Sequence, residues 1–179
     1  DRVTGQTIRV APGFSGAQLN GDVSDVAISG NGRFVALTTN ASNLINGDTN
    51  GDVDVYVRDR TSSTVERVSI SPFEGQGEGN SANPTLSDDG RYVAFDSQAL
   101  LAGGAVDRSN VYVRDRTGAT TFLVDVNSNE TVADDGGGNP MISGNGRYVV
   151  FGSNATNLVG NDTNGVGDVF RRDLQNGVT

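Results

Sequence analysis

The chain contains no cysteine, lysine, histidine or tryptophan among its 179 residues. Without cysteine, a disulfide framework, a thiolate nucleophile and a zinc–thiolate site are excluded. The usual pairs of nucleophile and base also need histidine, cysteine or lysine, which leaves carboxylates, hydroxyls and four tyrosines for any catalysis. No acidic residue is expected in an apolar setting that would raise its pKa toward that of a general acid. The sequence therefore predicts a protein that is not an enzyme.

Long apolar runs and basic charge are scarce as well. No run approaches the roughly 18 residues of a membrane span. The 13 basic residues are all arginine and face 22 acidic ones, giving a formal net charge of -9. Because binding a polyanion requires a basic surface, this balance argues against nucleic acid. What is abundant is glycine, with 25 residues, and this composition favours short strands joined by tight turns.

One segment occurs three times: ISGNGRFVALTTNASNL from Ile28, LSDDGRYVAFDSQALL from Leu86 and ISGNGRYVVFGSNATNL from Ile142. A second marker follows each copy: DVYVRDR from Asp54, NVYVRDR from Asn110 and DVFRRD from Asp168. The arginines of the first segment, at 33, 91 and 147, are 58 and 56 residues apart. The chain is therefore three repeats of about 57 residues.

Each repeat is predicted to form four strands, which in the middle repeat span residues 82–87, 91–97, 110–116 and 119–126. Asp89-Gly90 separates the first two, and such a pair tolerates the positive φ of a tight hairpin turn. The second strand is apolar on both faces, as in Tyr92, Val93, Ala94 and Phe95. Each sheet must then be covered on both sides, which favours the stacked blades of a propeller.

The run SDDGRYVAFDS from Ser87, followed by NVYVRDR, resembles the blade signature of TolB-type propellers, relatives of the WD-repeat propellers. The resemblance implies an all-β fold, a β-propeller of three four-stranded blades that forms a half-ring or part of a larger ring. We expect one propeller region, 1–179, with blade units at about 11–70, 71–126 and 127–179, and with 1–10 as a donated outermost strand. Blades of this type serve as docking domains, peptidase gates and surface modules, so the resemblance predicts fold more than function.

Two loops between the second and third strands carry similar acidic strings, GDTNGDVD from Gly47 and NDTNGVGD from Asn161. Oxygen ligands at alternate positions beside a glycine suit Ca²⁺. The candidate ligands are Asp48, Asn50, Asp52, Asp54, Asp162, Asn164 and Asp168. Backbone carbonyls and water would have to complete the shell, because the closing glutamate of an EF-hand is missing. In the alternative interpretation, these residues form Asx-turns and cap the next strand.

The middle repeat differs, since its loop keeps only Asp107 and Asn110 and carries Arg108, for which we expect an internal ion pair. The recurring Arg-Asp of the second marker, as in Arg58-Asp59, is predicted to pair across strands or cap a hairpin rather than to form an anion-binding ring.

Three blades are too few to close a propeller, which needs about four to eight. The two end blades should leave apolar faces bare, with 168–173 as an edge strand. A fourth-strand sequence at 6–10 is expected to complete the last blade of another copy, as in a head-to-head homodimer with six blades. A fragment of a longer propeller and a head-to-tail filament are the alternatives.

The sequence thus predicts a non-catalytic binding or assembly module, secreted or at the cell surface, whose partner is another protein or a second copy of itself. A carbohydrate-binding propeller lectin is one alternative, which the 6% aromatic content and the missing tryptophan disfavour. An accessory propeller domain of a larger secreted hydrolase is the other.

Overall fold

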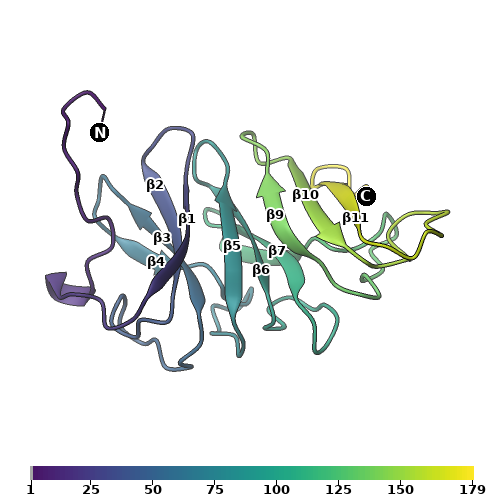
Figure 1. The fold of residues 1–179 in the computed structure, drawn as a ribbon, viewed down its shortest axis with the longest axis horizontal. Helices are drawn as coiled ribbons and strands as arrows, with labels where there is room; N and C mark the ends of the chain where they lie inside the picture. The colour runs from purple at the N-terminus through teal and green to yellow at the C-terminus, as the bar shows by residue number, and fades with distance from the viewer. Residues whose placement is uncertain (1) are drawn as a thin grey trace.

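The computed structural model describes residues 2–179 and arranges them as three antiparallel sheets side by side (Figure 1). Blade 1 has the order β1-β2-β3-β4, with bounds β1 (Val23–Ile28), β2 (Phe34–Thr39), β3 (Asp54–Asp59) and β4 (Val65–Arg67). Blade 2 repeats this order with β5 (Ser81–Leu86), β6 (Tyr92–Ser97), β7 (Asn110–Asp115) and β8 (Thr120–Leu123). Blade 3 has three strands, β9 (Gly138–Ile142), β10 (Tyr148–Ser153) and β11 (Asp168–Asp173). The predicted all-β propeller is confirmed.

The hairpins form where the repeat predicts them. Between β5 and β6, Gly90 adopts a φ of 71°, and the Asp89 carboxylate accepts the backbone N–H of Arg91 at 2.9 Å. The observed strands of blade 2 lie within one or two residues of the predicted ones, except the fourth, which ends at Leu123 instead of 126. That strand stops early because Val126 leaves the ladder and pairs with Val132 instead.

Apolar side chains fill the two junctions between blades. Val57 of β3 belongs to the same core cluster as Val93 and Phe95 of β6. At the next junction, Val113 of β7 shares a cluster with Phe151 of β10. The strand β6 therefore lies in the core on both faces, as its sequence predicted.

A glycine of each turn lets the next blade approach closely. A Cβ added at Gly90 would lie 2.2 Å from the ring of Phe34 in blade 1, and one at Gly146 would lie 2.4 Å from the ring of Tyr92 in blade 2. The equivalent glycine of blade 1, Gly32, has the same φ of 71° but no atom within 4 Å of that position. In blades 2 and 3, the turn glycine therefore packs against an aromatic ring of the preceding blade.

Arginine–aspartate pairs join the second and third strands of every blade. They are Arg33–Asp59, Arg91–Asp115 and Arg147–Asp173. Each aspartate also accepts backbone N–H groups of the turn that follows, as Asp115 does from Thr117 and Gly118. This confirms a pairing and capping role for the aspartate of the second marker. The expected ion pair of Arg108 forms as well, with Asp135.

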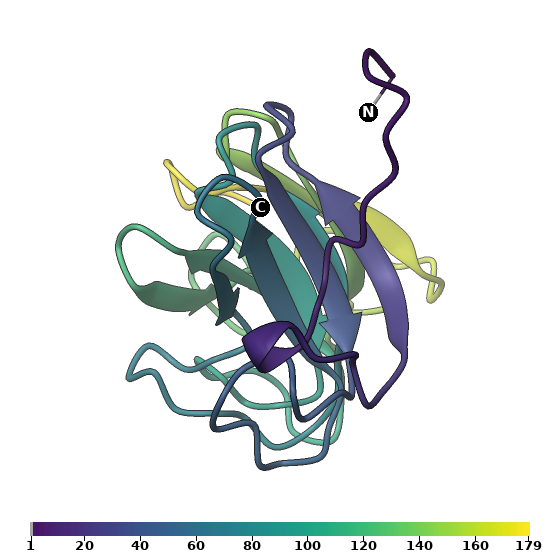
Figure 2. The same ribbon diagram turned by 90° about the vertical axis from the view of Figure 1, so that its left-hand side faces the viewer.

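The N-terminal segment passes in front of blade 1 without joining a sheet (Figure 2). The sequence predicts residues 6–10 as a fourth strand, but among the described residues 7–10 belong to no sheet. Residue 1 lies outside the described residues, and the role of 1–10 as a donated strand stays a prediction. Over residues 2–179, no helix has the length and apolar character that a membrane crossing requires.

Candidate functional site

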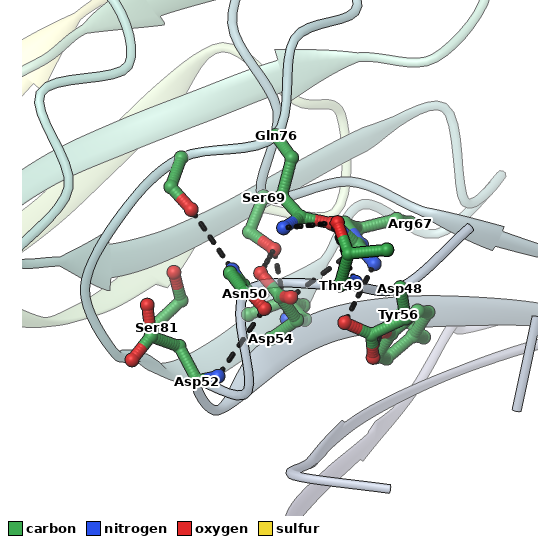
Figure 3. Close-up of polar contacts among 12 residues, drawn as sticks. Asp48, Thr49, Asn50, Asp52, Asp54, Tyr56, Arg67, Ser69, Gln76 and Ser81 are labelled. Carbon is green, nitrogen blue, oxygen red and sulfur yellow. Dashed lines mark hydrogen bonds and ion pairs between the residues drawn. The ribbon is translucent and has the colours of Figure 1, made fainter. Parts of the chain in front are cut away.

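The acidic loop of blade 1 surrounds an arginine (Figure 3). Arg67, at the end of β4, lies between Asp48 of the loop and Asp54 at the start of β3. Its NH2 is 3.1 Å from Oδ1 of Asp48, and its Nε is 3.5 Å from Oδ2 of Asp54. All three side chains are buried, so two carboxylates share one guanidinium away from water.

Neighbouring groups hold the two carboxylates in place. The hydroxyl of Tyr56 donates to Oδ2 of Asp48 at 2.7 Å, and the hydroxyl of Ser69 donates to Oδ1 of Asp54 at 2.6 Å. Burial raises the pKa of Asp54, and the Ser69 hydrogen bond and the positive charge of Arg67 only partly oppose it. Arg67 also contacts the side chain of Gln76. Hydroxyl donors thus hold the two carboxyl groups on one side, and Arg67 holds them on the other.

The other predicted ligands of this loop point elsewhere. The amide of Asn50 donates to the carbonyl of Gly77 at 2.8 Å, and the carboxylate of Asp52 accepts the N–H of Gly79 at 2.7 Å. Asn50 also accepts the N–H of Asp52, which is an Asx-turn. Within residues 2–179, no three acidic side chains converge as a metal-binding group. The turn interpretation therefore describes this loop, and calcium stays a prediction.

Blade 3 repeats the carboxylates without the arginine. Asp162 and Asp168 are half-buried and line a groove of about 540 Å³ beside Phe170 of β11. Asn164 donates to Oδ2 of Asp168 at 3.0 Å, and it forms the same Asx-turn as Asn50. In the described part of the chain, neither carboxylate has an ion-pair partner.

Blade 2 has lost both halves of the cluster. Asn110 replaces Asp54 and bonds the backbone of Ala105, while Leu123 replaces Arg67. Asp125, at the position of Ser69, is fully buried; its Oδ1 accepts the N–H of Val111, and its Oδ2 has no partner.

Burial raises the pKa of Asp125 to about 7. The expectation that no carboxylate occupies an apolar setting was therefore wrong. The reason is that β8 ends at Leu123 and Asp125 then packs beside Gly137, which directly precedes β9.

The outer sides of the end blades are apolar and bare. We call the side of blade 1 that carries Val26, Ile28 and Val35 the leading face, and the side of blade 3 that carries Met141, Val150 and Val169 the trailing face. The leading face lines a groove of about 670 Å³, together with residues of the N-terminal segment. The strand β11 is the edge of its sheet.

Solved structures share this arrangement of blades. TolB from Acinetobacter baumannii is 18% identical, with a TM-score of 0.52 over 90% of this chain and 32% of that chain. A putative TolB from Agrobacterium tumefaciens is 19% identical, with a TM-score of 0.52 over 89% of this chain and 47% of that one. The β-propeller domain of the Trilobed protease from Pyrococcus furiosus is 13% identical, with a TM-score of 0.55 over 88% and 40%.

The blades therefore have the β-propeller fold of these TolB structures. The chain spans between about one third and one half of the length of these structures. No family model and no curated protein matches the sequence. At such low identity the likeness establishes the fold of the TolB-like blades and leaves their activity open.

Sequence reasoning missed Arg67 and Asp125 as site residues. The signal for Arg67 was present in the repeat: the blade with two loop aspartates has arginine at this position, and the blade without them has Leu123. No comparable pattern marks Asp125, whose burial depends on how blade 3 packs.

Proposed function

We propose that the chain is a non-catalytic assembly module, in which two copies associate through their end blades to form a six-bladed ring. Each junction places the trailing face of one copy on the leading face of the other. The proposal rests on equivalent residues that differ in burial. Val55 and Val111 are 0% exposed at the internal junctions, whereas Val169, in the same repeat position on the trailing face, is 78% exposed.

The leading face supports the same conclusion. Ile28 is 60% exposed, while its equivalent in blade 2, Leu86, is 9% exposed. Burying apolar surface contributes roughly 25 cal/mol per Å², and the two faces would bury each other as the internal junctions do. Since the internal junctions already join a blade to its own repeat, the blades of a second copy complement these faces.

The mass in solution tests this proposal. Light scattering should give twice the chain mass of 18.6 kDa. Val26→Asp on the leading face should dissociate the pair, whereas Val106→Asp, at a similarly exposed loop valine, should not. A wild-type monomer would contradict the assembly, and a series of masses beyond two copies would indicate the filament instead of the ring.

The non-catalytic role is supported by the surroundings of Asp125, whose pKa burial raises to about 7. Because Asp125 is fully buried, a substrate in solution does not reach it. Calcium at the acidic loops stays a prediction. In blade 1, Arg67 already faces both carboxylates and weakens their attraction for another cation. Thermal unfolding with Ca²⁺ and with a chelator tests it, and an unchanged midpoint would remove calcium.

A further inference from the structure

The N-terminal segment has the sequence of a fourth strand. Moving 58 residues back from 60–69, which contains β4, gives residues 2–11, and this shift places Arg9 at the position of Arg67 and Val10 at that of Val68. Gly5 has a φ of 70°, close to the 63° of its equivalent, Ser63, in the turn before β4. The segment thus keeps the turn of the repeat, and among the described residues 8–11 belong to no sheet.

The acidic loop and the fourth strand change together along the chain. Where the loop provides Asp48 and Asp54, the fourth strand provides Arg67 between them. In blade 2, where Asn110 replaces Asp54 and no carboxylate takes the place of Asp48, the fourth strand has Leu123. Blade 3 keeps both loop carboxylates; among residues 2–179 its sheet contains three strands, and no arginine forms an ion pair with either carboxylate.

We propose that residues 8–11 of one copy form the fourth strand of blade 3 in the second copy, with Arg9 between Asp162 and Asp168. This inference rests on the proposed ring and names the contact that fixes its register. The trailing and leading faces meet at that junction, and residues 9–11 already lie beside the leading face. Arg9 is exposed in the single chain, so it is available to a partner.

The pairing of β3 with β4 in blade 1 predicts the register of the donated strand on β11. There Tyr56 pairs with Arg67 and Val57 pairs with Glu66. The same register places Arg9 opposite Phe170 and Ile8 opposite Arg171. The N–H of Val10 would then reach the carbonyl of Val169, as Val68 N–H reaches the Val55 carbonyl at 2.9 Å.

The donated strand starts at residue 8 because the chain's own Thr179 already fills the position before it. The hydroxyl of Thr179 donates to the carbonyl of Val126, as the hydroxyl of Thr121 donates to the carbonyl of Ile70 one blade earlier. Arg172 donates to the Thr179 hydroxyl at 3.1 Å, as Arg114 donates to that of Thr121 at 3.2 Å. Thr179 of the acceptor and Ile8 of the donor would thus follow one another along the same edge.

Engineered disulfides test the register of the donated strand on β11, because the chain has no cysteine of its own. Full-length protein carrying Ile8→Cys and Arg171→Cys should form covalent dimers under mild oxidation, since residues directly opposite in antiparallel strands bring their Cβ atoms to about 4.5–5.5 Å. Ile8→Cys with Val169→Cys, two residues out of register on the same face, is the matched control and should cross-link much less. Equal yields would contradict the register.

Exchanging the charges of Arg9 and Asp162 tests the proposed ion pair between the two copies. Arg9→Asp should raise the dissociation constant of the dimer by about tenfold or more, because two partly buried carboxylates lose their counter-charge. Arg2→Asp makes the same charge change on the same segment, outside the donated residues, and should have little effect. Combining Arg9→Asp with Asp162→Arg should restore association.

The outcomes separate this inference from the proposed ring. A wild-type chain of single mass would contradict the ring. A wild-type dimer that forms no Ile8–Arg171 cross-link and is insensitive to Arg9→Asp would keep the ring and overturn strand donation. If association instead required Ca²⁺ and was insensitive to Arg9→Asp, the carboxylates of blade 3 would bind a metal ion rather than an arginine.

Discussion

Arg91 and Asp115 form a two-point ion pair that ties β6 to β7, with Nε to Oδ1 at 2.9 Å and NH2 to Oδ2 at 2.6 Å. Arg91 directly precedes β6, and Asp115 ends β7, where its register partner is Tyr92. Because Asp115 also caps the following turn, one carboxylate fixes both the strand register and the hairpin to β8.

Replacing Arg91 with Gln should therefore lower the thermal midpoint by a few degrees. The same change at Arg58, which forms no ion pair within residues 2–179, should have a smaller effect. Arg91 holds the pKa of Asp115 below its ordinary value, so the contribution of the pair is present above about pH 4 and is lost as the pH falls further. Scanning calorimetry at neutral and acid pH measures both effects, and equal losses for the two variants would contradict the role of the pair.

The buried Asp125 should give the stability an opposite dependence on pH. Its pKa is about 7 in the folded chain and about 4 when unfolded, so the folded state holds an extra proton between these values. The free energy of unfolding should fall by up to about 1.4 kcal/mol per pH unit as the pH rises through this window, and then level off.

Asp125→Asn should remove that slope, because the amide cannot ionise. Urea unfolding at several pH values between about 4 and 8 measures it, with Asp107→Asn in an exposed loop as the control. A slope that persists in Asp125→Asn would show that another group is responsible.

Removing Arg67 alone should be costly, since Asp48 and Asp54 would stay buried without their counter-charge. We expect Arg67→Met to reduce the free energy of unfolding by about 3–5 kcal/mol. The triple variant with Asp48→Asn and Asp54→Asn should recover much of the loss, because no charge then remains buried. Denaturant unfolding compares the two, and a triple variant less stable than Arg67→Met would contradict an electrostatic origin.

The approach of Phe34 to Gly90 predicts a steric effect. Gly90→Ala adds a methyl group 2.2 Å from the Phe34 ring in addition to the strain of a positive φ. Gly103→Ala carries similar strain with nothing within 4 Å, so the difference between their thermal midpoints isolates the contact between blades. Gly90→Ala should have the lower midpoint by several degrees, and equal midpoints would mean that the junction yields easily.

The fold was largely predictable because every blade repeats the same local signals. The Asn-Gly or Asp-Gly turn, the strand that is apolar on both faces and the constant spacing all indicate the same hairpins, so three copies reinforce one interpretation. The third blade follows the same pattern. Its sequence predicts 168–173 as an edge strand beside a bare apolar face, and in the structure β11 is the edge of its sheet with Val169 exposed.

The candidate site was harder to predict because it depends on where side chains point. The alternation of Asp48, Asn50, Asp52 and Asp54 suits a cation, yet the loop directs them toward different partners. Arg67 reaches the loop from a strand more than ten residues further along, and periodicity within one element does not report such a contact. The sequence signal for this contact lies in the difference between blades, because arginine occurs at 67 and leucine at the equivalent position 123.

The open space at Gly32 allows a test of whether the proposed ring closes. Gly90 and Gly146 each lie against an aromatic ring of the preceding blade, and Gly32 has the same backbone with no such neighbour. In the proposed ring, the second copy supplies the preceding blade, and its Tyr148 takes this place. A methyl group at residue 32 would add only the strain of a positive φ to a single chain, whereas in the proposed ring it would also meet an aromatic ring. Gly32→Ala should therefore weaken association more than it weakens the fold.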